Sequence, residues 1–134
     1  MATRSVIAKL DDKGVQAIYC HNDGYLSNNG KILDQHYQNE VKVDNLIAQG
    51  DCSSLKDTIE DTIFYMRDRG ESNKEATTLK DESALLEFAF ESCDAEVVYM
   101  FAYGSWYVYD NSDKIGNSSY QFIELEEALY NVLA

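Results

Sequence analysis

The start of the chain contains two short runs in which apolar and polar positions alternate. Val6 and Ala8 share one face of the first run, residues 3–10, and residues 15–20 repeat the pattern. The residues between them are Asp-Asp-Lys-Gly, and Gly14 can adopt the positive φ that tight turns need. Two alternating runs joined by such a turn predict a β-hairpin.

Apolar residues recur at helical spacing after this hairpin. The pattern predicts one helix over about 29–38, capped by one of the polar residues 27–29. A second helix is expected over about 40–49, with Gly50 at its C-terminal cap.

The middle of the chain predicts one strand and one loop. Residues 62–66 are rich in β-formers and predict a third strand. The polar stretch 71–80 predicts a loop, and Asp81 is expected to cap a helix over about 82–92.

The last third predicts a second hairpin and a final helix. Residues 96–103 and 106–109 are β-rich and flank Gly104-Ser105, which we expect to be the two-residue link. The helix is expected over about 124–133. These elements predict a single α+β domain over residues 1–134. Its antiparallel sheet is expected to consist of two hairpins and a central strand, with about four helices packed mainly on one face.

Composition sets limits on function. The chain has 134 residues, 45% of them hydrophobic and 12% aromatic, and its formal net charge is -13. This apolar content excludes a disordered acidic tail. The negative charge argues against direct binding to nucleic-acid phosphates.

The negative charge is concentrated in the second part of the chain. Residues 1–80 contain 13 acidic and 10 basic residues, whereas residues 81–134 contain 11 acidic residues and one basic residue, Lys114. Such asymmetry is typical of an interaction surface, although it is also compatible with a solubilising face. The acids that we expect to bind a partner are Glu87, Glu91, Asp94, Glu96, Asp110, Asp113, Glu124 and Glu127.

The sequence predicts a cytoplasmic protein that does not interact with membranes. No apolar run approaches the roughly 18 residues of a membrane-spanning helix, and the start does not resemble a signal peptide. The cysteines Cys20, Cys52 and Cys93 are odd in number and widely spaced, which favours a reducing compartment. We expect all three to be small buried hydrophobes.

A second candidate site combines basic residues with a histidine loop. Arg67 and Arg69, if they lie on a strand, would point the same way and could hold a phosphate or carboxylate. Arg4 could join them, and Asp23 could orient His21 as a general base. The alternatives are ion pairs within the protein for the arginines and a simple turn at Asp23-Gly24. No complete catalytic signature is present, so we predict no catalytic residues, no metal and no cofactor.

Aromatic residues gather in the second hairpin. Trp106 is surrounded in sequence by Tyr99, Tyr103, Tyr107 and Tyr109. Such residues form cross-strand core pairs or anchor protein interfaces. The hairpin could therefore also mediate formation of a homo-oligomer.

Several short motifs together resemble a known family. They are Thr3-Arg4-Ser5-Val6-Ile7, Ile18-Tyr19-Cys20-His21 followed by Asp23-Gly24-Tyr25, Asn29-Gly30-Lys31-Ile32-Leu33, His36-Tyr37, Gly50-Asp51 with Ser53-Ser54-Leu55, and Phe64-Tyr65 with Arg67-Asp68-Arg69-Gly70-Glu71. This succession resembles a family of small, mostly uncharacterised bacteriophage and prophage proteins. The resemblance implies a phage protein that acts in the host cell cytoplasm, and it supplies no catalytic residues.

Two functional hypotheses follow. The first is a phage-encoded, non-enzymatic interaction protein that inhibits a host nucleic-acid-binding defence system, of the anti-CRISPR or anti-restriction type. Its acidic surface would mimic DNA and occupy the basic groove of a host protein. The alternative is a pocket protein that binds or sequesters a small anionic nucleotide signal of host immunity through Arg4, His21, Asp23, Arg67 and Arg69. Enzymatic activity is left open and is not favoured.

Overall fold

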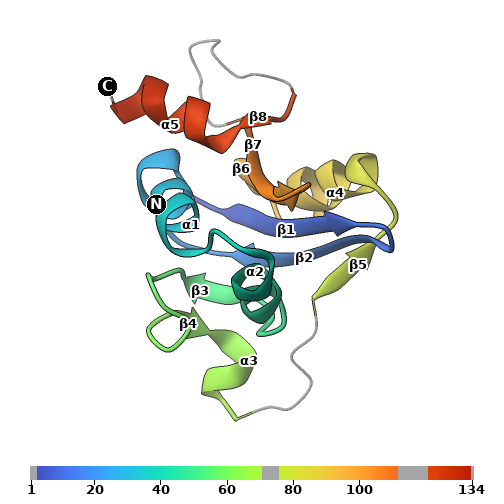
Figure 1. Cartoon of the computed structure of the whole chain (residues 1–134). Helices are drawn as coiled ribbons and strands as arrows, with labels where there is room; N and C mark the ends of the chain where they lie inside the picture. Colours follow the sequence, from blue (N-terminus) through green and yellow to red (C-terminus); the bar gives the residue numbers. More distant parts are fainter. Residues whose placement is uncertain (1–2, 71–75, 112–120, 134) are drawn as a thin grey trace.

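The structure is a computed structural model that describes residues 3–70, 76–111 and 121–133, without the side chains at positions 67, 132 and 133. Its strands are β1 (Ser5–Asp11), β2 (Gly14–Cys20), β3 (Cys52–Ser54), β4 (Ile63–Phe64), β5 (Thr77–Leu79), β6 (Val97–Ala102), β7 (Ser105–Asp110) and β8 (Ile123–Glu124). Its helices are a π-helical turn (Leu26–Gly30) that leads into α1 (Lys31–His36), then α2 (Glu40–Ile47), α3 (Tyr65–Asp68), α4 (Glu82–Glu87) with a following π-helical turn (Phe88–Ser92), and α5 (Leu125–Leu133). The predicted single α+β domain is confirmed (Figure 1).

The strands form one mixed sheet in the order β4-β3-β2-β1-β6-β7-β8, with β5 paired to β2. Both predicted hairpins, β1–β2 and β6–β7, are present and antiparallel. The expectation of a wholly antiparallel sheet was wrong, because β1 pairs with β6 in parallel and β2 pairs with β3 in parallel. Each of these parallel pairs joins strands that are separated by helical segments, which supply the crossover that parallel pairing needs.

The predicted third strand is much shorter than expected and is not central. Only Ile63–Phe64 form a strand, β4, at the edge of the sheet, and α3 begins at the next residue. The carboxylate of Asp68 accepts a hydrogen bond from the backbone N–H of Phe64 at 2.9 Å. This local bond satisfies the backbone at the start of the helical turn, so the chain turns away from the sheet.

Two further sequence expectations are corrected. Thr77–Leu79, which lie in the predicted loop, form β5 and pair with β2. Residues 27–29 do not cap the first helix, because its N-cap is Tyr25 and makes no side-chain bond. The predicted cap at Asp81 is confirmed, since its carboxylate accepts from the N–H of Ala84 at 2.9 Å.

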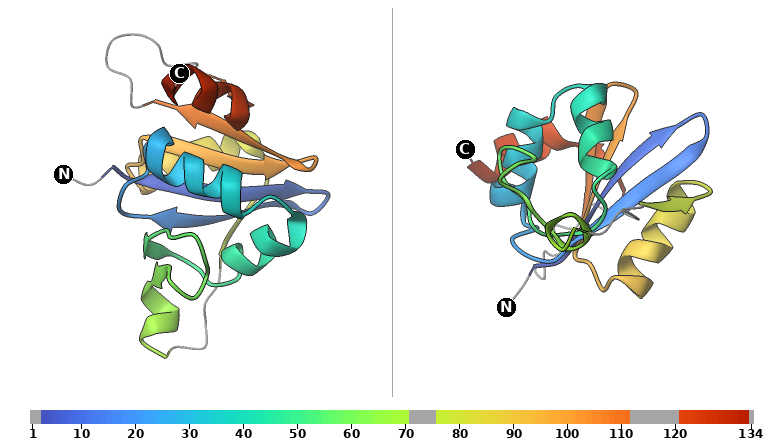
Figure 2. Two further views of the ribbon diagram at one scale, coloured as in Figure 1. Left: turned by 60° about the vertical axis from the view of Figure 1, so that its left-hand side comes forward. Right: turned by 90° about the horizontal axis from the view of Figure 1, so that it is seen from below.

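Helices cover both faces of the sheet (Figure 2), and the buried side chains form a separate core on each face. Ile7 points into a core shared with α1, α2 and α5, whereas its neighbours Val6 and Ala8 point into a core shared with α4. Alternate residues of a strand face opposite sides, so α4 and α5 are separated by the sheet.

The turn between β6 and β7 is formed by Tyr103 and Gly104, one residue earlier than predicted. Ala102 and Ser105 pair directly, and the φ angles of Tyr103 and Gly104 are 55° and 81°. Two successive positive φ values are typical of the type I′ turns that close tight hairpins. Tyr103 adopts a backbone conformation that side-chain-bearing residues rarely take, and its side chain is 90% exposed.

Candidate partner-binding site

The turns of the two hairpins lie at the same end of the sheet, which we call the turn end. This follows from the parallel pairing of β1 and β6, in which Lys9 lies opposite Phe101, close to the end of each strand (Figure 2). The turn end contains two pockets, one on each side of the Tyr103–Gly104 turn, and Phe101 and Gly104 line both of them.

The first pocket has a volume of about 250 Å³ and an aromatic wall. Trp106 is 6% exposed, and its Nε1 donates a hydrogen bond to the carbonyl oxygen of Tyr37 at 2.8 Å. Phe101 packs edge-on against the indole, with 5.3 Å between ring centroids. Because both rings are fixed by packing and the indole N–H is satisfied within the protein, this wall is rigid.

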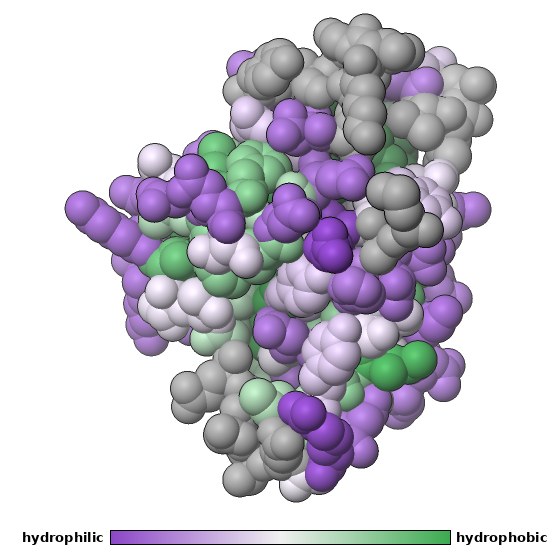
Figure 3. Space-filling view, turned by 180° about the vertical axis from the view of Figure 1, so that it is seen from behind, coloured by the Kyte–Doolittle hydropathy of each residue, from purple (hydrophilic) through white to green (hydrophobic). Residues whose placement is uncertain are grey.

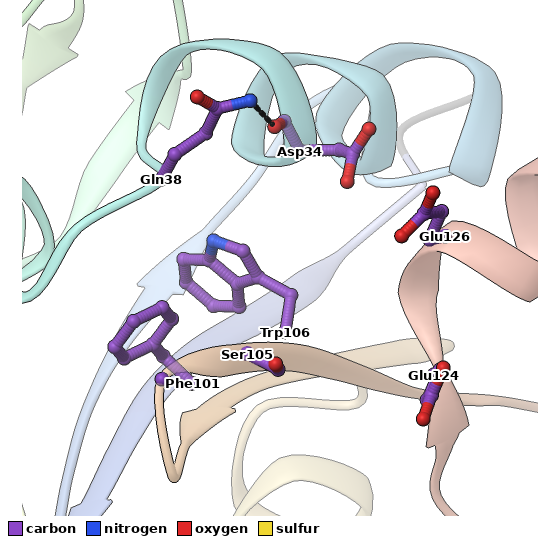
Figure 4. Close-up of a pocket in the computed structure, with 8 residues that line it drawn as sticks. Asp34, Gln38, Phe101, Ser105, Trp106, Glu124 and Glu126 are labelled. Atoms are coloured by element: carbon purple, nitrogen blue, oxygen red, sulfur yellow. Dashed lines mark hydrogen bonds between the residues drawn. The ribbon is translucent and has the colours of Figure 1, made fainter.

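Carboxylates line the opposite side of the first pocket. They are Asp34 from α1, Glu124 from β8 and Glu126 from α5. Figure 4 shows the carboxylates of Asp34 and Glu126 directed toward each other. Burial, together with the charge of Glu126, raises the pKa of Asp34. Within the described residues, no lysine or arginine forms an ion pair with these three side chains.

The second pocket, of about 260 Å³, is also acidic. Asp11, Asp12 and Glu40 line it, together with Lys9. The Nζ of Lys9 is already bonded to Glu40 at 2.9 Å and to Asp44 at 2.5 Å. Burial lowers the pKa of Lys9, but the bonds to Asp44 and Glu40 outweigh this effect and raise it. Lys9 therefore remains charged and neutralises part of this pocket, so the first pocket has the larger uncompensated charge.

The predicted acidic surface is divided by the sheet. Glu87 and Glu91 are exposed on the helical segment that covers one face, whereas Glu127 is exposed on α5, on the other. Seen from the α4 side, hydrophilic side chains are interspersed with apolar ones (Figure 3). Of the predicted partner-binding acids that the structure describes, Glu124 is the one that lines a turn-end pocket.

The remaining acids of the predicted set lie elsewhere. Asp110 ends β7 and pairs with Val97, and Glu96 immediately precedes β6, so both lie at the ends of these strands farthest from the turn. Asp94 is nearby and pairs with Arg4 at 3.3 Å. Asp113 lies outside the described residues.

The structure brings together part of the alternative ligand pocket. Tyr19 connects His21 with Arg4, because its hydroxyl lies 2.7 Å from Nδ1 of His21 and also forms a hydrogen bond with Arg4. Burial raises the pKa of Tyr19 despite the opposing effect of Arg4, so the phenol stays protonated and can donate to the imidazole. Tyr19, and not the predicted Asp23, is therefore the residue that orients the His21 ring.

The strand geometry on which the predicted arginine fork depends is not present. The backbone at position 67 belongs to α3 and not to a strand, and its side chain lies outside the described set. Arg69 follows α3 and contacts the sulfur of Met66 at 3.8 Å. The argument that strand geometry aligns Arg67 with Arg69 therefore fails.

Comparison with protein-family models, curated protein sequences and solved structures finds no match for this chain. The resemblance to phage proteins stays a prediction. None of the described helices is long and apolar enough to cross a membrane. Within the same residues, no group of three His, Cys, Asp or Glu side chains could hold a metal ion.

Sequence reasoning missed most of the turn-end site. The site includes four acids from residues 1–80, where the net charge is small: Asp11, Asp12, Asp34 and Glu40. The charge asymmetry therefore gave no indication that they contribute to a site. Glu126 is adjacent to predicted acids but was not singled out. The one available signal was the Tyr103-Gly104 pair, because an aromatic residue in a tight hairpin turn must project from the sheet.

Proposed function

We propose that this protein is a non-enzymatic interaction protein whose turn end binds basic side chains of a partner protein. The observation that carries the proposal is the first pocket, in which three carboxylates without a basic partner among the described residues face a rigid aromatic wall. A guanidinium or ammonium group would pair with the carboxylates, and its alkyl chain would pack on Phe101 and Trp106.

The fuller form of the proposal concerns the partner. A protein surface rich in arginine and lysine is typically one that binds nucleic acid, so occupation of it by this protein would exclude nucleic acid. A net charge of -13 would also accelerate association with such a surface. Together with the sequence resemblance, this supports a phage-encoded inhibitor of a host nucleic-acid-binding defence protein.

The nucleotide-binding alternative has weaker support. Arg4, one of the cations of the predicted pocket, is engaged by Asp94 and Tyr19. A phosphate at that position would have to displace a carboxylate, and Asp51, whose side chain accepts the N–H of Tyr19 at 2.9 Å, adds further negative charge.

The test uses charge reversals that are matched in net charge. Glu124→Lys with Glu126→Lys alters the first pocket, whereas Glu87→Lys with Glu91→Lys alters the other face by the same amount. Binding of an arginine-rich peptide is followed by the fluorescence of Trp106, the single tryptophan, which lines the pocket. We expect the pocket variant to bind at least about tenfold more weakly, equivalent to about 1.4 kcal/mol, and the other variant to lose much less.

Two outcomes bear on the proposal directly. Equal weakening in both variants would show that net charge alone governs binding, and the pocket proposal would be wrong. The proposal that the partner binds nucleic acid is tested by affinity capture of host proteins on the immobilised protein. Duplex DNA should displace the captured proteins from the wild type, and the pocket variant should not retain them. If duplex DNA does not displace the captured proteins, the proposed nucleic-acid-binding partner is wrong, but the pocket proposal is unaffected.

A further inference from the structure

The core beneath the sheet contains two cysteines on neighbouring strands. Cys20 ends β2, Cys52 begins β3, and the two residues are directly paired in the parallel register. Both side chains are fully buried in the same core. Paired residues of adjacent strands lie about 4.8 Å apart, within the range of about 4.4–6.8 Å between the Cα atoms of disulfide-bonded cysteines.

The surroundings of the two thiols are polar and asymmetric. The side-chain amide of Asn29, itself buried, lies 3.5 Å from the sulfur of Cys20 and also donates to the hydroxyl of Ser5 at 3.2 Å. The sulfur of Cys20 lies 3.7 Å from the carbonyl oxygen of Asn22. A hydrogen bond from the thiol of Cys52 lowers the pKa of Cys20 and raises that of Cys52. Cys20 is therefore the first of the two to ionise, and Cys52 keeps its proton.

We propose that Cys20 and Cys52 form a redox pair that hydrogen peroxide converts into a disulfide. The Cys20 thiolate attacks one peroxide oxygen and becomes a sulfenic acid, and hydroxide leaves. The Cys52 sulfur then attacks the Cys20 sulfur; the S–S bond forms, and the sulfenic oxygen leaves as water with the proton of Cys52. The pair loses two electrons and the peroxide gains them, and an added dithiol reverses the change.

The fold provides access despite the burial. β3 has three residues and its partner β4 has two, and Cys20 is the residue of β2 that pairs with β3. β4 is the edge strand and β3 lies next to it, and such short strands with few ladder bonds open locally more readily than the central strands, which admits a small oxidant. The disulfide would then fix β3 to β2 and close the loop that contains α1 and α2.

Cys93 provides an internal contrast. It is half-buried against the core on the other face of the sheet, so it cannot reach Cys20 or Cys52 in the folded protein. Burial and the charge of Asp51 raise the pKa of Cys93 to about 11, which makes it a poor nucleophile at neutral pH.

The experiment uses the full chain with Cys93→Ser, so that any intramolecular disulfide must join Cys20 to Cys52. The folded, reduced protein is treated with hydrogen peroxide, quenched, and alkylated under denaturing conditions. We expect the chain to lose the mass of two hydrogen atoms and to take up no alkyl group, with a single cross-linked peptide that contains both cysteines. The oxidised form should melt at a higher temperature, and dithiothreitol should restore the original melting point.

The controls keep the outcome decisive. With Cys20→Ala or Cys52→Ala added, no intramolecular disulfide can form and the rise in melting temperature should vanish. If either variant fails to fold, the Cys93→Ser protein alone still decides the matter. Two thiols that remain alkylatable after native peroxide treatment, or a disulfide that forms only in the urea-unfolded chain, would overturn the proposal. The readout does not involve partner binding, so its failure leaves the proposed function untouched.

Discussion

The two ends of the central strands differ in how their charges are compensated. At the turn end, Asp34, Glu124 and Glu126 face a pocket without a basic partner among the described residues. At the opposite end, Arg4 is held by Asp94 and Tyr19, and Tyr19 holds His21. Uncompensated charge in a concave place favours binding to another molecule, whereas charge that is paired internally contributes to the fold. The absence of local ion pairs around acidic side chains is therefore a better indication of a binding site than the net charge of the chain.

The largest expected effect comes from removal of the aromatic wall at the turn end. Trp106→Ala should lower the free energy of unfolding by about 3–5 kcal/mol, because a large buried ring is lost. Trp106→Phe keeps an apolar wall and loses the bond to Tyr37, so it should cost less. Chemical denaturation followed by circular dichroism measures both. A loss below about 1 kcal/mol for the alanine variant would contradict the packing described for this pocket.

Tyr103 offers a test in which stability and binding should change in opposite directions. Tyr103→Gly relieves a positive φ and should raise the free energy of unfolding by up to about 1 kcal/mol. The same change removes an exposed aromatic ring and should weaken binding of the arginine-rich peptide by about two- to fivefold, a cation–π contribution of about 0.5–1 kcal/mol.

The neighbouring Ser105→Gly is the control for this variant, since Ser105 lies in β7 and is not among the residues with positive φ. It should destabilise the protein, and it serves as a control for stability only, because Ser105 itself lines the first pocket. Equal stability changes at positions 103 and 105 would show that the turn conformation of Tyr103 is not strained.

Asp34 should show a pH-dependent effect of smaller size. Its pKa is raised in the folded state, so its ionised form is less stable there than in the unfolded chain. This penalty is fully present above the folded-state pKa and disappears as the pH falls below the unfolded value of about 3.9. Asp34→Asn should therefore melt at a higher temperature than the wild type at pH 7, with a difference that vanishes on acidification.

Although Asp34→Asn should raise the melting temperature, it should weaken binding of the arginine-rich peptide, because one carboxylate of the pocket is lost. Fluorescence titration of Trp106 at pH 7 measures this loss. A variant that is less stable than the wild type at neutral pH would contradict the direction given for the pKa of Asp34.

The smallest effects are expected at the opposite end of the sheet. Arg4→Ala removes a partly exposed ion pair with Asp94, so the free energy of unfolding should fall by no more than about 1 kcal/mol. Binding of the arginine-rich peptide should not weaken, since Arg4 lies far from both turns along β1. A marked loss of peptide binding would show that the two ends do not act independently.

Local patterns in the sequence predicted local structure well. The β1–β2 and β6–β7 hairpins and the helix capped by Asp81 depend on neighbouring residues, and each is present. The parallel pairing of β1 with β6 depends on contacts between distant segments, which periodicity cannot reveal. The same reason explains the missed site: Asp34, Glu124 and Glu126 converge only because α1 and α5, which are distant in sequence, are neighbours in the fold. The strand predicted at 62–66 failed for a local reason, since the carboxylate of Asp68 bonds to the backbone of Phe64.

The pairing of β1 with β6 also bears on how the protein is made. Ser5 and Val97 are neighbours in the sheet but are separated by most of the chain. Pairing between such distant segments is slow to form, because a long loop must close before the contacts are gained. During synthesis, β1 must wait for β6 to leave the ribosome, with its partner edge uncovered until then. The first pocket therefore forms only after α5 has left the ribosome, because α5 supplies Glu126.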